Sequence, residues 1–250
     1  MIFDTPPSNW KELQRLVCQA FQEMSCYSEL EKTIDLVRGK KEIDVYVEDF
    51  VHDIRLKILI ECKQWNSDIH QDVIHGFRTV VNDSGANKGI IIVKKGFQSG
   101  AYEASDKAPI ELLSWEEFNI KYFKKWRESC ERRLREKALE LHEFRNFPYG
   151  PSCDEPLVEL SREEHDDWWE YMNGFSMILI LGNRKLLSEL DEGPVKIIHP
   201  NSDLEKAEDL NWWEITSYRE WYDYANSELD RWLKKTREWN RKFESRRESA

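Results

Sequence analysis

Three residues in the early part of the chain have the types and the spacing for metal chemistry. Glu61 and Lys63 flank Cys62 at the end of an apolar run, and Asp44 lies in the segment before it. Two carboxylates that converge make a hard oxygen site of the kind that Mg²⁺ or Mn²⁺ prefers. A metal ion held there could lower the pKa of a bound water and neutralise charge on a phosphate, while the lysine orients that water. These residue types therefore suit metal-assisted chemistry on a phosphate.

The spacing of Glu61 and Lys63 places both on one side of a strand, because successive strand residues alternate between faces. Cys62 then points the other way, into the core. An acid and a lysine at the end of an apolar strand need a partner or a ligand, since unpaired burial is costly. A hairpin can bring Asp44 beside Glu61, although the sequence leaves the register open. The alternative is a salt bridge on the surface of a strand. No other Asp/Glu-x-Lys triplet occurs in the chain.

The elements that must position these residues follow from the pattern of apolar side chains. Ser8 is predicted to cap the first helix, with Glu12 in its first turn, and Ser114 is predicted to cap a helix that contains Glu117. The expected order is helix 8–24, strands 42–48 and 55–63, helix 67–82, strand 89–93, helix 97–105 and strand 110–113. This order predicts an α/β fold, a mixed sheet flanked by helices.

Several pieces of this region, in order, match one known family. They are Gly39 with EIDV (42–45), LIECKQW (59–65), HQDVIHGF (70–77), ANKGIIIV (86–93), GFQSGAYEAS (96–105) and IELLSWEEF (110–118). Together they resemble the catalytic domain of Mrr-like restriction endonucleases, in the PD-(D/E)XK nuclease superfamily. The resemblance covers about residues 8–120 and implies the restriction-endonuclease-like core of that superfamily.

The resemblance also implies roles for single residues. Asp44 and Glu61 would be metal ligands, the backbone carbonyl of Cys62 a further ligand, and Lys63 the catalytic lysine. The metal would be Mg²⁺, with Mn²⁺ as a substitute. Glu12 lies where such domains often carry an acidic residue, although it could equally serve the helix dipole. Gln71 lies on the following helix, where a polar residue sometimes assists. Cys62 departs from the small or apolar residue common there, but a buried Cys behaves as one.

The composition sets limits on other functions. The net charge is −11, and carboxylates outnumber basic side chains in both halves, so the totals locate no DNA-binding face. The five cysteines are widely spaced, which argues against a zinc ribbon or a disulfide framework and favours reduced thiols. No apolar run is long enough to span a bilayer, no signal peptide is recognisable, and no P-loop motif is present. A cytoplasmic location away from the membrane is therefore expected.

The second half of the chain differs in composition. Residues 121–250 are predicted to be mainly α-helical and rich in tryptophans that pack, as a domain separate from the nuclease domain 1–120. This domain would bind a partner, form a homodimer or sense a signal. The overall prediction is a metal-dependent endonuclease acting on DNA, mostly double-stranded, with a role in restriction or antiphage defence suggested by the resemblance alone. The alternatives are an inactive nuclease-fold scaffold or binding module, and a nuclease for RNA or branched DNA.

Overall fold

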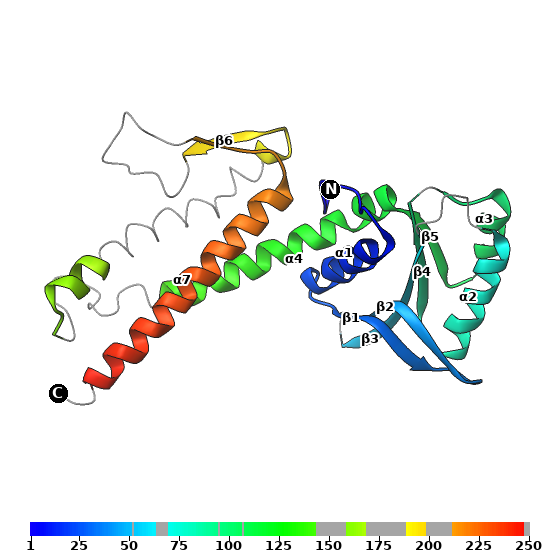
Figure 1. The fold of residues 1–250 in the computed structure, drawn as a ribbon, viewed down its shortest axis with the longest axis horizontal. Coiled ribbons are helices and arrows are strands. Elements are labelled where there is room, and N and C mark those ends of the chain that lie inside the picture. Colours follow the sequence, from blue (N-terminus) through cyan, green and yellow to red (C-terminus); the bar gives the residue numbers. More distant parts are fainter. Residues whose placement is uncertain are drawn as a thin grey trace. The chain divides into compact units, whose positions relative to one another are not determined.

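The computed structural model describes residues 1–51, 53–63, 70–94, 96–106, 108–143, 159–168, 189–198 and 212–247 (Figure 1). The chain divides into two compact units, Met1–Cys130 and Glu131–Ala250. The residues singled out for chemistry all lie in the first unit.

The first unit is built around a mixed five-stranded sheet with the strand order β1-β2-β3-β4-β5. Strands β1, β2 and β3 pair antiparallel, whereas β3, β4 and β5 pair parallel. The elements in chain order are α1 (Trp10–Glu23), β1 (Tyr27–Asp35), β2 (Lys40–Val51), β3 (Ile54–Lys63), α2 (Gln71–Asp83), β4 (Lys88–Val93), α3 (Ser99–Ser105), β5 (Ile110–Ser114) and α4 (Trp115–Glu143). Helix α1 lies on one side of the sheet and α2 and α3 lie on the other (Figure 1). The predicted α/β class is confirmed.

Strand β3, at the centre of the sheet, and its neighbour β4 carry continuous apolar runs, as their sequences predict. Ile60 of β3 and Ile90, Ile91 and Ile92 of β4 are fully buried. A continuous apolar run of this kind is typical of a strand that is covered on both faces. Gly89 makes the packing of α2 on β4 possible, because a Cβ atom there would lie 2.7 Å from a side-chain carbon of Val81. The core therefore holds the end of β3 in a fixed position.

Helix α1 begins one residue later than predicted. Asn9, not Ser8, is the N-cap, and its side chain accepts a hydrogen bond from the backbone N–H of Glu12. Ser8 instead donates both its N–H and its hydroxyl to the Glu12 carboxylate. The prediction of Ser8 as the cap was wrong, because two neighbouring residues can both cap and only the backbone path decides between them. At α4 the predicted capping pair of Ser114 and Glu117 is confirmed, with reciprocal bonds of 2.7 and 3.1 Å.

Strand β1 was missing from the predicted order. Its sequence, YSELEKTID, has no apolar alternation, and only two of its side chains, Ser28 and Ile34, are buried. It is an edge strand that pairs with β2 alone. An edge strand with one solvated face needs few apolar residues, so the pattern that identifies a strand in a sequence is weak there.

The described part of the second unit is mainly helical, as predicted. The end of α4 runs beside α7 (Tyr218–Arg247), with Lys137 2.7 Å from Asn226 and Arg237 2.6 Å from Glu140. A two-stranded sheet joins β6 (Val195–Ile198) and β7 (Trp212–Ile215). Of the tryptophans in this unit, Trp221 and Trp232 are buried, whereas Trp212 is exposed. Much of the region 144–211 lies outside the described residues. Among the described helices, none is long and apolar enough to cross a membrane.

Candidate active site

Asp44 and Glu61 lie next to each other where two strands separate. The last pair of the β2–β3 ladder joins Val45 with Ile60. Asp44 and Glu61 are the next residues on their strands, immediately beyond that pair. Past this point β3 continues beside β4 only, with Glu61 paired to Ile91. The carboxylates predicted to converge are therefore brought together at the end of the β2–β3 ladder.

The Asp44 side chain is fixed by the backbone of β3. Its Oδ2 atom accepts a hydrogen bond of 2.7 Å from the N–H of Cys62. The carboxylate therefore takes the place of the backbone acceptor that this N–H loses when the ladder ends. One oxygen of Asp44 is held in this way, and the carboxylate is pre-oriented beside Glu61.

Lys63 lies close to both Glu61 and Asp44. Its Nζ atom lies 2.5 Å from Oε2 of Glu61 and 3.7 Å from Oδ2 of Asp44. The Glu61 side chain is 9% exposed, whereas those of Asp44 and Lys63 are 22% and 24% exposed. The three charged groups thus form one cluster that is partly open to solvent. Glu61 and Lys63 form a salt bridge, as in the alternative considered from the sequence, but the Glu61 carboxylate is buried instead of lying on the surface.

Burial and neighbouring charges have opposite effects on the pKa values of Glu61 and Lys63. Burial, together with the nearby negative charge of Asp44, raises the pKa of Glu61 above its ordinary value, although Lys63 and Lys41 act in the opposite direction. Burial alone would lower the pKa of Lys63, but the charges of Glu61 and Asp44 outweigh it and raise this pKa. Lys63 is therefore an ammonium ion at neutral pH. A second positive charge beside Glu61 would relieve the repulsion between the two acids.

The donor set fits a divalent cation that takes oxygen ligands. Asp44 and Glu61 supply two carboxylates, and a backbone carbonyl is available beside them. The carbonyl of Lys63 accepts from the N–H of Lys94, which follows β4. Neighbouring strand residues turn their backbone groups to opposite sides, so the Cys62 carbonyl faces β2, as its N–H does. No group of three His, Cys, Asp or Glu side chains within the described ranges could hold a metal. Water would have to complete the shell, as is usual for Mg²⁺.

Comparison with known proteins points to one family. Residues 7–119 match the family model Mrr_cat, described as a restriction endonuclease. The first half of the chain is an Mrr-like restriction endonuclease domain. The matched region contains Asp44, Glu61 and Lys63. The family match identifies this region as a nuclease domain with the PD-(D/E)XK fold.

Two solved structures are similar to parts of the chain. One is titled a protein of unknown function, AF1548, with 19% identity and a TM-score of 0.37 over 43% of this chain and 59% of that chain. The other is the MspJI restriction endonuclease in complex with a 27-mer oligonucleotide, with 16% identity and a TM-score of 0.27 over 40% of this chain and 24% of that one. The chain therefore spans less than two thirds of either structure. No curated protein matches.

Glu12 has a structural role at the start of the Mrr-like domain. Its Oε2 atom accepts from the N–H and the hydroxyl of Ser8, at 2.6 and 2.5 Å, and its Oε1 atom lies 3.7 Å from Arg15. The hydrogen bonds from Ser8 lower the pKa of Glu12. All these partners belong to the beginning of α1. The structure thus favours the helix-start role, which the sequence left open.

Gln71 is the first residue of α2 and is exposed. Its Oε1 atom would lie 3.3 Å from a Cβ atom built on Gly100, so the side chain lies against α3. A role for Gln71 in chemistry stays a prediction. Lys41 is a site neighbour that the sequence did not single out, and its charge acts on Glu61. Strand alternation does not predict this, because Lys41 and Asp44 stand three residues apart on β2 and such residues lie on opposite faces of a regular strand.

Proposed function

We propose that the Mrr-like domain is a metal-dependent endonuclease that hydrolyses phosphodiester bonds in DNA, mostly double-stranded. The observation that supports this most directly is the meeting of Asp44, Glu61 and Lys63 at the end of the β2–β3 ladder. Asp44, Glu61 and the Cys62 carbonyl would hold Mg²⁺, for which Mn²⁺ would substitute. When bound, the ion supplies a water of lowered pKa and neutralises charge on the phosphate.

The protein's own groups would contribute in distinct ways. The hydrogen bond from the Cys62 N–H keeps the Asp44 carboxylate in place before the ion or the DNA arrives. Lys63 would act as a charged hydrogen-bond donor, because the nearby carboxylates raise its pKa and keep it an ammonium ion. Its ammonium group would orient the attacking water and stabilise the extra negative charge of the transition state. Burial of Glu61 keeps the centre partly dry, which strengthens these charge interactions.

The domain 121–250 is part of the same proposal. We infer that it binds a protein partner, forms a homodimer or senses a signal that controls cleavage. A dimer would suit the cutting of both strands, since each strand needs an active centre. A cytoplasmic role in restriction or antiphage defence is consistent with a restriction endonuclease domain.

Cleavage of supercoiled plasmid by the purified full chain tests the proposal. Reactions would contain Mg²⁺, Mn²⁺ or EDTA, and the variants Glu61→Ala and Lys63→Ala would be compared with Glu48→Gln. Glu48 is a matched control because it is a carboxylate on β2 that pairs with Arg55. We expect metal-dependent cutting by the wild type and by Glu48→Gln, and a loss of cutting in the other two variants.

The other outcomes are informative. Cutting that survives both Glu61→Ala and Lys63→Ala would place the active centre elsewhere. Metal binding without cutting of DNA would point to an activator, or to RNA or branched DNA as substrate, which labelled substrates side by side would distinguish. Neither metal binding nor cutting would favour the inactive scaffold or binding module.

A further inference from the structure

Glu31 interrupts the edge strand directly across from Asp44. The β1–β2 ladder pairs Leu30 with Val45 and Lys32 with Ile43, and the pair between them, Glu31 with Asp44, is missing. Glu31 has a φ of 50°, which is a left-handed conformation that a residue with a side chain rarely adopts. The register is the same on both sides of the gap. The strand therefore makes a local turn without slipping.

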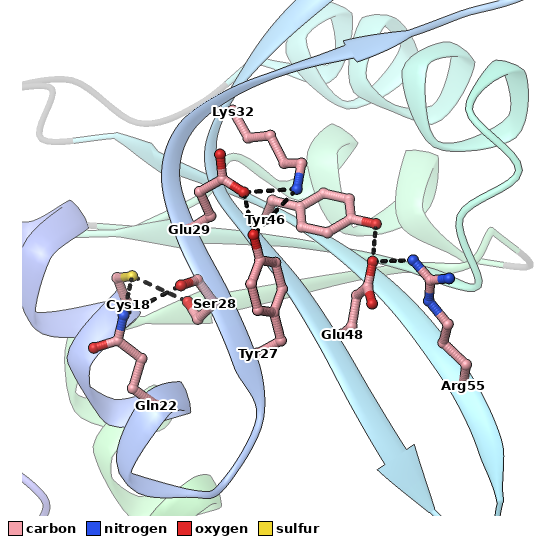
Figure 2. Close-up of polar contacts among 9 residues, drawn as sticks. All are labelled: Cys18, Gln22, Tyr27, Ser28, Glu29, Lys32, Tyr46, Glu48 and Arg55. Carbon is pink, nitrogen blue, oxygen red and sulfur yellow. Dashed lines mark hydrogen bonds and ion pairs between the residues drawn. The ribbon is translucent and has the colours of Figure 1, made fainter.

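Contacts of Lys32 with Glu29 and Tyr46 stabilise this turn. Residues three apart in a regular strand lie on opposite faces, yet Lys32 reaches back to Glu29, with Nζ 2.6 Å from Oε2. Figure 2 shows β1 curving sharply between these two residues. The Lys32 ammonium also lies 4.3 Å from the ring centre of Tyr46, which stands two residues after Asp44 on β2. Lys32 thus connects the turn in β1 to β2, the strand that carries Asp44.

The position of the turn coincides with the separation of β2 from β3. At Asp44, β2 leaves β3, because the ladder between them ends at Val45 and Ile60. Strand β1 stays paired to β2 before and after that point, so β1 bends at the position where the β2–β3 ladder ends. A left-handed residue allows such a bend within one residue. Strained residues of this kind persist where the surrounding structure holds them, and they gather at functional sites.

We propose that Glu31 is a positioning residue of the metal site: its left-handed backbone lets β1 turn where β2 leaves β3 and thereby holds the Asp44 carboxylate in place. The effect is a backbone effect. The Glu31 side chain is exposed, and within the described residues no hydrogen bond or ion pair of its carboxylate is found. For metal binding the inference rests on the proposed function, whereas for the placement of Asp44 it does not.

Four variants of the full chain separate the backbone from the carboxylate. Glu31→Gly accepts a positive φ freely, Glu31→Gln keeps the side-chain size without the charge, and Glu31→Val disfavours this conformation strongly. Asp53→Val is the matched control, because Asp53 has a φ of 65° in the turn after β2, at the other end of the β2–β3 ladder. Should Glu31→Val not fold, Glu31→Ala against Glu31→Gly provides the same contrast.

Two readouts are measured for each variant. The first is hydrogen exchange of the Cys62 amide by NMR in EDTA, which reports the bond to Asp44 without metal or substrate. The second is Mn²⁺ affinity by titration calorimetry. We expect Glu31→Val to exchange the Cys62 amide at least about tenfold faster and to bind Mn²⁺ about 10–100-fold more weakly, as loss of a supporting contact does. Glu31→Gly and Glu31→Gln should resemble the wild type in both readouts.

The outcomes separate the possible explanations. Asp53→Val should lower thermal stability and leave both readouts unchanged, which shows that strain elsewhere does not reach the site. Wild-type behaviour of the Cys62 amide in Glu31→Val would overturn the proposal, and so would equal losses in Glu31→Gly and Glu31→Gln. If the wild type binds no Mn²⁺ while the Cys62 amide still responds to Glu31→Val, the proposed function fails and the positioning of Asp44 by Glu31 stands.

Discussion

The carboxylate of Asp44 accepts a hydrogen bond of 2.7 Å from the backbone N–H of Cys62. This one contact closes the end of the β2–β3 ladder, which has its last pair at Val45 and Ile60. It also holds a candidate metal ligand within 3.7 Å of Lys63. The same side chain therefore supports the strand end and the candidate active site, and these two roles can be separated by substitution.

Asp44→Asn and Asp44→Ala are expected to differ in stability but not in metal binding. Asparagine can still offer its Oδ1 atom to the Cys62 N–H, whereas alanine leaves that donor without its acceptor. Urea unfolding should therefore show Asp44→Ala to be less stable than Asp44→Asn by about 1–3 kcal/mol. Calorimetry should show that both variants lose Mn²⁺ affinity. Equal stability of the two variants would mean that the hydrogen bond to Cys62 contributes little.

Metal should stabilise the protein through Glu61. A ligand that binds only the folded state at about 100 times its Kd raises the free energy of unfolding by about 2.7 kcal/mol. Thermal unfolding of the wild type should therefore shift upward with Mn²⁺, and the shift should vanish in Glu61→Gln. Glu48→Gln, with its carboxylate paired to Arg55, should keep the shift. An undiminished shift in Glu61→Gln would remove Glu61 from the metal site.

The pH dependence of metal binding follows from the raised pKa of Glu61, which burial and Asp44 cause. Metal must displace a proton from this carboxyl, so affinity should fall as the pH drops through a value above 4.5, the ordinary pKa. In EDTA, where no metal is bound, the free energy of unfolding depends on pH in the opposite direction. Between pH 4.5 and the raised pKa only the folded state keeps the proton, so the stability contributed by Glu61 falls as the pH rises.

Calorimetric titrations with Mn²⁺ from pH 4.5 to pH 7.5 would measure the first effect, and urea unfolding in EDTA would measure the second. Glu61→Gln provides the comparison, since its stability should lack this part of the pH dependence. Metal affinity that stays constant down to the ordinary pKa of a glutamate would contradict the raised pKa.

Gly89 and Gly76 form a matched pair in the packing of α2. A Cβ atom at Gly89 would lie 2.7 Å from Val81 and 2.8 Å from Phe77, whereas nothing lies within 4 Å of one at Gly76. Gly89→Ala should therefore destabilise the domain by about 1–3 kcal/mol. Gly76→Ala, in the middle of the helix, should stabilise it by about 0.4–1 kcal/mol. Denaturant unfolding of both variants measures this, and equal effects would mean that α2 moves away from β4 at little cost.

The local elements that carry the candidate site could be predicted from the sequence alone. The apolar runs Ile58–Ile60 and Ile90–Val93 predicted two buried strands, and these are the central strand β3 and its neighbour β4. Alternation placed Glu61 and Lys63 on one face, and their 2.5 Å contact agrees with that. Such features depend on residues close together in the chain, which is why a pattern in the sequence carries them.

Features that depend on residues far apart in the chain could be seen only in the folded structure. The register of β2 against β3 brings Asp44 to Cys62, and the left-handed turn at Glu31 faces Asp44 across an edge strand without a recognisable pattern. The choice of Asn9 over Ser8 as the helix cap is a smaller case of the same kind. Register, burial and the pKa of Glu61 arise from contacts that form when strands meet. No window of the sequence contains those contacts, because each joins residues that the chain brings together only when it folds.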